Sequence, residues 1–229
     1  KEIWETHVGA KALFFQYIKE QTGVELNPEI LTIGFARRAA TYKRGDLIFE
    51  NLDKLLEIGS GKLQFVFGGK AHPNDEEGKK VIQRIIQHTE KMRGKIELVY
   101  LENYNMEIAS RFIPGVDIWL NTPMRPLEAS GTSGMKAALN GVPNFSVLDG
   151  WWIEGHIEGG TGWSIGPPST ETSTAVNHSD EDVEDLYKKL EETIIPLFYK
   201  DRAGWIKLMK NAIGKNAYYF NTHVMMRRY

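Results

Sequence analysis

Small and polar residues precede a lysine in the segment 128–136 (EASGTSGMK). Between an expected strand and an expected helix, such residues leave backbone N–H groups free where the helix dipole favours an anion. The spacing matches neither the GxxxxGK[ST] loop of nucleotide-binding proteins nor the GxSxG turn of serine hydrolases. Lys136 lies on the expected helix, where a lysine can bind an aldehyde cofactor covalently while the loop binds its phosphate. The pattern alone leaves open a second interpretation, a turn with a solvated lysine.

Four cations lie close together in the segment 37–44 (RRAATYKR), namely Arg37, Arg38, Lys43 and Arg44. Like charges at this spacing repel one another unless an anion pairs with them. Arginine suits a two-point grip on phosphate, whereas lysine acts as a mobile point charge. The segment therefore indicates either an anion site or a solvated basic turn.

Short continuous apolar runs predict strands that are covered on both faces, as in a parallel sheet. Helix-like stretches lie between these runs, and the alternation indicates right-handed βαβ units. We therefore predict an α/β fold with a Rossmann-like, doubly wound parallel sheet. The expected strands are 30–36, 63–69, 96–101, 116–121 and 144–148, and the helices among them are 46–59, 78–94, 105–113 and 134–140.

The two ends of the chain are predicted to be helical. We expect a leading helix within residues 1–22 and a closing helix within 203–229. A further helix is expected at 179–194, with Ser179 as its N-cap and acidic residues in its first turn. Residues 1–229 are expected to form a single Rossmann-like domain.

Residues 150–178 are rich in Gly, Ser, Thr and Pro, and they predict an ordered loop region. Three tryptophans lie in it: Trp151, Trp152 and Trp163. Large aromatic side chains tie weakly packed segments to a core, so we expect this role rather than stacking on sugars.

Polar motifs follow the expected strands. ARRAATYKR comes after the first, GGKAHPND after the second, ENYN after the third and TPMRPLEASGTSGMK after the fourth. Ligands of open α/β sheets bind beyond the carboxyl ends of the strands. The order of the motifs therefore predicts one site, at that edge of the sheet.

The segment 128–136, with NG at 140–141 and LDG at 148–150, resembles the signature around the cofactor lysine of glycogen, starch and maltodextrin phosphorylases. GWWIEG at 150–155 and NTH at 221–223, followed by residues 227–229, resemble the shorter bacterial and archaeal branch of these α-glucan phosphorylases. The resemblance runs the length of the chain. It implies the C-terminal catalytic domain of a glycosyltransferase with two Rossmann-like domains, whose N-terminal domain is missing here.

The resemblance also implies roles for individual residues. Pyridoxal 5'-phosphate would be bound covalently to Lys136. The other cofactor-binding residues would be Gly131, Thr132, Ser133, Arg37, Tyr104 and Asn105, the substrate phosphate would be held by the catalytic residues Arg38 and Lys43, and the sugar by Glu128, Ala129 and Ser130.

The chain departs from the family pattern at several positions. Asn105 replaces the arginine of the ENYR motif, and either contacts phosphate through its amide or is a simple loop residue. Ser133 and Gly134 stand where the animal enzymes have Gly and Asn, a change that keeps the loop small. Ala40 and Thr41 replace a histidine and a glutamate. Lys70 follows the second strand and is either part of the same cleft or a turn lysine.

The implied activity transfers a terminal glucosyl unit from an α-1,4-glucan to orthophosphate and releases glucose 1-phosphate. In this family the phosphate of the cofactor, rather than its ring, moves a proton. Without the N-terminal domain, the chain is expected to have little activity and to bind the cofactor weakly. The alternatives are a sugar-nucleotide-dependent glycosyltransferase like glycogen synthase, and a non-catalytic module that binds carbohydrate or phosphate.

Composition excludes several classes of protein. A formal net charge of -2 gives no global attraction to polyanions, so nucleic acid is not expected as a partner. The chain has no cysteine, and its six histidines lack metal-site spacing, so we assign no metal. No apolar run approaches the roughly 18 residues of a membrane span, and no signal peptide opens the chain, so we expect a cytoplasmic protein. A homo-oligomer is compatible with these features.

Overall fold

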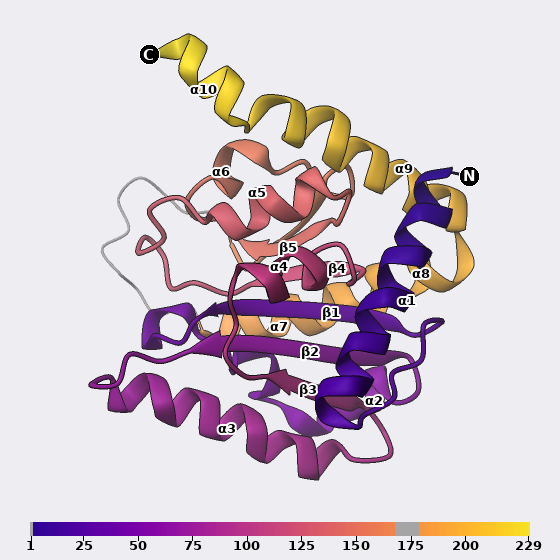
Figure 1. The fold of residues 1–229 in the computed structure, drawn as a ribbon, viewed down its shortest axis with the longest axis vertical. Helices are drawn as coiled ribbons and strands as arrows, with labels where there is room; N and C mark the ends of the chain where they lie inside the picture. The colour runs from indigo at the N-terminus through magenta and orange to yellow at the C-terminus, as the bar shows by residue number, and fades with distance from the viewer. Residues whose placement is uncertain (1, 168–178) are drawn as a thin grey trace.

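The computed structural model describes residues 2–167 and 179–229. Its strands form one parallel sheet in the order β3-β2-β1-β4-β5-β6 (Figure 1). This order is that of the Rossmann fold, so the prediction of a doubly wound parallel α/β sheet is confirmed. The strands are β1 (Leu31–Arg38), β2 (Leu63–Lys70), β3 (Glu97–Leu101), β4 (Ile118–Asn121), β5 (Asn144–Val147) and β6 (Gly162–Ile165).

Side chains of β1, β2, β3 and β4 alternate between two apolar cores, one on either face of the sheet. In β1, Leu31 and Phe35 enter one core, and Ala36 enters the other. Gly34 also faces the second core, where an added Cβ would lie 2.8 Å from Val116. Because both faces are buried, the strands appear in the sequence as continuous apolar runs.

Helices cover both faces of this sheet. The core around Trp119 is covered by α1 (Glu2–Thr22), α4 (Met106–Phe112) and α5 (Thr132–Leu139). The core around Phe65 is covered by α2 (Leu52–Gly59), α3 (Glu76–Met92), α7 (Ser179–Lys189), α8 (Ile195–Lys200) and α9 (Arg202–Asn211). In Figure 1, α1 and α4 lie in front of the sheet and α7 lies behind it.

Some helices differ in detail from their expected ranges. The segment 46–59 forms a 3-10 turn at Leu47–Phe49 before α2 begins, because the Asn51 side chain accepts a hydrogen bond from the Lys54 N–H (3.0 Å) and caps the second helix. Ser179 is the first residue of α7, which continues into a π-helical turn at Leu190–Ile194. The closing segment comprises α9, a π-helical turn at Ala212–Ala217, and α10 (Thr222–Arg228).

The segment 150–178 is more regular than the expected loop region. It contains the short helix α6 (Trp152–Gly155) and the edge strand β6, while residues 168–178 lie outside the described residues. With four residues, the first of them Gly162, β6 is too short to show a period, and its pairing with β5 defines it. Trp151, Trp152 and Trp163 are all buried, so their predicted core role is confirmed.

Within residues 2–167 and 179–229, no helix combines the length and the apolar character that crossing a membrane requires.

Candidate functional site

The candidate site lies at the carboxyl ends of β1 and β4. These neighbouring strands mark the point where the strand order of the sheet reverses, which is where open α/β sheets bind ligands. Arg37 is near the end of β1, and Asn121 ends β4. The loop after β4 carries Glu128 and leads into α5. The segments 37–44 and 128–136, far apart in the sequence, therefore meet at one edge of the sheet.

Arg37, Lys43 and Glu128 form a compact ionic group. Arg37 Nη2 and Lys43 Nζ both donate to Glu128 Oε2, at 2.5 Å and 2.6 Å. Only 8%, 10% and 9% of the Arg37, Lys43 and Glu128 side chains are exposed. Arg37 Nη1 is buried too, and it has no hydrogen-bond partner among the described residues. One carboxylate thus pairs with two cations and leaves a guanidinium N–H group unsatisfied.

This group keeps Glu128 ionised. Burial by itself would raise the pKa of the Glu128 carboxyl, but the hydrogen bonds and positive charges of Lys43 and Arg37 outweigh burial. The pKa of Glu128 therefore lies below its ordinary value, and the side chain is a carboxylate at neutral pH.

Asp149 holds the backbone of the Glu128 loop. Its carboxylate accepts hydrogen bonds from the N–H of Glu128 (2.9 Å) and from the N–H of Gly150 (2.9 Å). The Trp151 N–H donates to the Ser130 carbonyl at 2.8 Å. Burial raises the pKa of the Asp149 carboxyl, in spite of the backbone N–H groups that donate to it. Asp149 is the middle residue of the LDG motif at 148–150, and the motif by itself does not indicate this role.

Gly150 allows these two segments to approach each other. Its φ is +55°, and an added Cβ would lie 2.6 Å from the Ser130 carbonyl oxygen. A side chain at this position would therefore push the Glu128 loop away from Asp149.

Lys43 is the last residue of a 3-10 turn, Thr41–Lys43, that β4 and its loop hold in place. The Met124 N–H donates to the Tyr42 carbonyl (2.7 Å), and Thr122 Oγ1 donates to the Lys43 carbonyl (3.1 Å). Lys43 Nζ also lies 4.4 Å from the centre of the Tyr42 ring. The loop after β4 therefore holds the backbone of Lys43, and the Tyr42 ring lies beside the Lys43 ammonium group.

The other two cations of the segment 37–44 point elsewhere. Arg44 is buried and pairs with Asp182 of α7 (2.6 Å), whose second oxygen pairs with Arg125 (2.6 Å). Arg44 therefore links β4 and α7. Arg38 is exposed at the end of β1, in register with the exposed Lys70 of β2. The structure brings neither Arg38 nor Lys70 into the ionic group.

The loop before α5 is closely packed. Gly131 precedes the helix with φ +83°, and Trp119 Nε1 donates to Ser133 Oγ (3.2 Å). An added Cβ at Gly134 would lie 2.5 Å from Asn144 Oδ1, so only glycine fits there.

Lys136 and Thr132 are exposed on the same face of α5, one turn apart. Ala129 and Ser130, which are expected to bind the sugar, are exposed in the preceding loop. The types of donor on these segments fit a phosphorylated aldehyde. The exposed Lys136 amine is available for covalent attachment, and the unpaired, buried Arg37 Nη1 is a donor that an anion would satisfy.

Tyr104 and Asn105 lie on the loop after β3. The Tyr104 ring packs edge-on against Phe112 (6.1 Å), and burial raises the pKa of Tyr104 to about 12, so its hydroxyl stays protonated. The Asn105 side chain accepts a hydrogen bond from the Ile108 N–H (2.9 Å) and caps α4. Capping is neither of the two roles that the sequence indicated for Asn105, although an asparagine directly before a helix commonly caps it.

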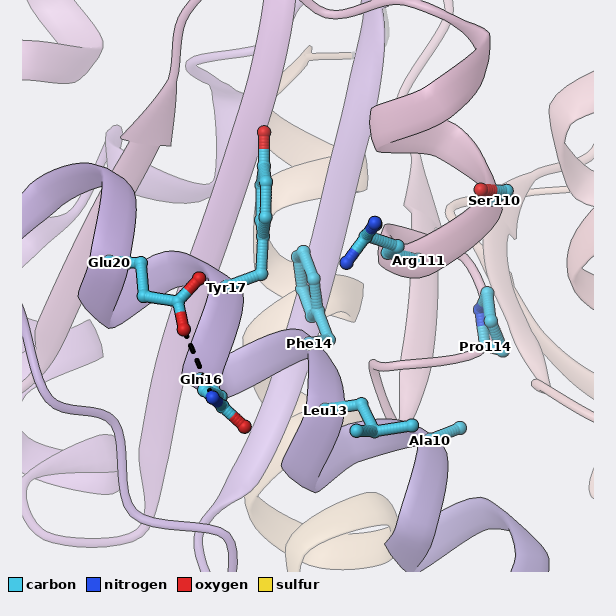
Figure 2. Close-up of a pocket in the computed structure, with 9 residues that line it drawn as sticks. All are labelled: Ala10, Leu13, Phe14, Gln16, Tyr17, Glu20, Ser110, Arg111 and Pro114. Carbon is cyan, nitrogen blue, oxygen red and sulfur yellow. Dashed lines mark hydrogen bonds between the residues drawn. The ribbon is translucent and has the colours of Figure 1, made fainter.

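A separate hollow lies between α1 and α4 (Figure 2). Its polar groups are partly paired with one another, since Gln16 donates to Glu20 (3.0 Å) and the Arg111 guanidinium lies over the Tyr17 ring (5.2 Å). It contains none of the motif residues. Across residues 2–167 and 179–229, no group of three or more histidine or acidic side chains is arranged to hold a metal ion.

Comparison with known proteins gives a consistent result. The family model described as carbohydrate phosphorylase matches residues 1–209. Maltodextrin phosphorylase of Thermococcus litoralis is 44% identical over 100% of this chain and 29% of its own length. Glycogen phosphorylase of Aquifex aeolicus is 39% identical over 100% of this chain and 36% of its own length. Glycogen phosphorylase of Mycobacterium tuberculosis is 38% identical over 82% of this chain. The chain spans about a third of the length of the first two relatives.

Proposed function

This chain belongs to the carbohydrate phosphorylase family, and from that membership we propose that it is the C-terminal, cofactor-carrying part of an α-glucan phosphorylase. The whole enzyme would transfer a terminal glucosyl unit from an α-1,4-glucan to orthophosphate and release glucose 1-phosphate. The N-terminal domain of the same enzyme would complete the site. A cytoplasmic location is part of this proposal.

The observation that carries the proposal is the ionic group at the switch point of the sheet. Arg37 and Lys43 present buried positive charge there, and a buried guanidinium N–H has no partner among the described residues. Two phosphate groups that meet in a low-dielectric cleft repel each other strongly. Cations fixed in advance at this place would offset that repulsion.

We assign the residues as follows. Lys136 would hold pyridoxal phosphate covalently, and Gly131, Thr132 and Ser133 at the start of α5 would bind its phosphate with Arg37. When bound, the cofactor would supply a phosphate group able to exchange a proton with the substrate phosphate. Tyr104 would stand near this phosphate as a neutral hydrogen-bond donor.

The substrate phosphate would be bound by Lys43 and Arg38. Lys43 is already fixed at the site, whereas the exposed Arg38 would have to turn inward. Glu128 is a carboxylate and would accept hydrogen bonds from sugar hydroxyls, with Ala129 and Ser130 beside it. These residues would bind and orient the two substrates.

Borohydride trapping tests the proposal. The chain would be incubated with a stoichiometric amount of pyridoxal phosphate, reduced with borohydride, and digested for peptide mass spectrometry. We expect the pyridoxyl group on Lys136, with its loss in Lys136→Arg and its retention in the matched control Lys70→Arg. A label spread over exposed lysines, or absent from Lys136, would contradict the cofactor assignment and favour a glycosyltransferase without a cofactor lysine.

A further inference from the structure

We propose that the Glu128 carboxylate is a built-in competitor of phosphate, which occupies the Arg37–Lys43 pair until a phosphate dianion displaces it. The inference rests on the proposed function, because it takes these two cations as part of the phosphate site. It adds a regulatory step to that site.

The contacts of Glu128 resemble those of a substitute ligand. A single oxygen, Oε2, accepts from both Arg37 Nη2 and Lys43 Nζ, and Arg37 Nη1 remains buried without a partner among the described residues. In this position only one of the two carboxylate oxygens accepts from the cations, and Nη1 is left without an acceptor. A phosphate presents more acceptor oxygens in a tetrahedral arrangement, so it could reach Nη1 as well. The cation pair is therefore better matched to phosphate than to the carboxylate that occupies it.

There is no room for both anions at once. The cavity that Arg37 and Lys43 line together and the cavity that Arg37 and Glu128 line together each have a volume of only about 10 Å³. Such a space holds roughly one water molecule and excludes a phosphate. Phosphate can pair with Arg37 and Lys43 only if the Glu128 side chain moves.

The Glu128 side chain can move while its backbone stays in place. The backbone N–H is held by Asp149, and a Glu side chain has rotatable bonds beyond that anchor. Two glycines leave space around it. An added Cβ at Gly150 would lie 3.1 Å from Glu128 Cγ, and an added Cβ at Gly131 would lie 3.4 Å from the same atom. We expect a change of rotamer, with the backbone held in place, to empty the anion site.

Displacement has a consequence for the sugar. A carboxylate paired with two cations is a poor acceptor for hydroxyl groups, whereas a displaced carboxylate is available to them. Phosphate binding would thus prepare Glu128 for the sugar, which couples the two substrates positively.

Calorimetric titration with inorganic phosphate tests the inference on the full chain. A competing contact that is formed nine-tenths of the time weakens the apparent affinity about tenfold. We therefore expect Glu128→Gln to bind phosphate about tenfold more tightly than the parent, and Glu128→Ala to bind it more tightly as well. The exposed Glu154→Gln of α6 is the matched control and should leave the affinity unchanged. Equal or weaker binding by both Glu128 variants, or no detectable binding in any protein, would overturn the proposal.

A Lys43→Ala titration separates this inference from the proposed function. If Lys43→Ala binds phosphate as well as the parent does, the phosphate site itself is wrongly assigned. If Lys43→Ala weakens binding while the Glu128 variants fail to strengthen it, the site stands and only the competitor is refuted. Circular dichroism of each variant checks that it is folded.

Discussion

At the scale of single residues, the position of each cation in the segment 37–44 determines what it does. Arg37 and Lys43 meet Glu128 at the carboxyl edge of the sheet, while Arg44 turns to Asp182 of α7. A lysine that follows Arg37 by six positions can reach the same carboxylate because the 3-10 turn bends the chain back. The positive charge that these residues share does not indicate which of them pairs with Glu128 and which with Asp182.

Lys43→Ala is expected to impair catalysis more than folding. Removing one fixed donor from a site of developing charge lowers turnover about 100-fold or more. Arg37 would still pair with Glu128, so the loss of stability should stay near 1 to 2 kcal/mol. Phosphorolysis rates of the full-length enzyme and urea unfolding of the same variants measure the two effects. The exposed Lys70→Ala is the control, and unchanged phosphorolysis in Lys43→Ala would contradict the assignment.

At the scale of elements, β6 is a short edge strand that depends on side-chain hydrogen bonds. Glu158 Oε2 accepts from the N–H and the hydroxyl of Ser164 (2.9 Å each) and from His156 (2.6 Å). Lys189 of α7 lies 3.5 Å from the other carboxylate oxygen. Burial would raise the pKa of Glu158, but these hydrogen bonds and the Lys189 charge lower it to about 2.

The stability of the protein should therefore depend on Glu158 between pH 4.5 and pH 2. A carboxyl whose pKa is lowered on folding stabilises the protein above its unfolded pKa, and this effect is lost as pH falls through the folded pKa. We expect Glu158→Gln to cost about 1 kcal/mol at pH 7, since solvent screens a half-exposed charge, and almost nothing near pH 2. Urea unfolding across this range measures the difference. The exposed Glu184→Gln is the control, and a cost that does not vary with pH would refute the prediction.

A buried ionic group at the amino ends of β1 and β4, opposite the candidate site, holds the helix α1 to the sheet. Asp117, just before β4, accepts from His7 (2.8 Å) and Lys11 (2.6 Å) of α1 and from the Thr32 N–H (2.7 Å) of β1. Lys11 also donates to the Ile30 carbonyl (2.8 Å). Burial would raise the pKa of Asp117, but the Lys11 charge and the His7 contact hold it below its ordinary value.

Asp117→Asn should destabilise the chain strongly. The change leaves Lys11 buried without its counter-ion, which typically costs about 3 to 5 kcal/mol. Urea unfolding measures this loss, and hydrogen exchange should show the amides of α1 opening before those of β2. The exposed Asp53→Asn, at the start of α2, should cost about 1 kcal/mol or less. A similar small cost for Asp117→Asn would show that α1 is held by apolar packing alone.

At the scale of the whole molecule, the sheet order creates an open edge at which the site is only partly enclosed. Lys136, Thr132 and Arg38 are exposed, and the chain spans about a third of the length of its phosphorylase relatives. Catalysis by electrostatic stabilisation needs a cleft from which water is excluded. We expect the described residues to form one wall of such a cleft.

The chain alone should therefore show little or no phosphorolysis. We expect glucose 1-phosphate to form from maltooligosaccharide and phosphate only when the N-terminal remainder of a full-length relative is supplied in trans. Pyridoxal phosphate should also bind more tightly in that mixture, as its absorbance band would report. Robust phosphorolysis by the 229-residue chain without any partner would refute this prediction.

The sequence by itself determined the fold class and the place of the motifs. Strands buried on both faces leave continuous apolar runs, and the four longer runs were all found near their expected ranges. The motif after each strand had to reach the carboxyl edge, because parallel strands all end there. Among the described strands only β6 was not predicted, since its four residues, the first of them Gly162, carry no readable period.

Only the tertiary structure decided which charges pair. Glu128 meets Arg37 and Lys43 from 91 and 85 positions away, and Arg44 meets Asp182 from 138 positions away. Such pairs depend on strand order and on the path of each loop, which local composition does not encode. The role of Asp149 depends on the tertiary structure for the same reason. Its carboxylate accepts hydrogen bonds from two backbone N–H groups, and the residue types do not indicate such contacts.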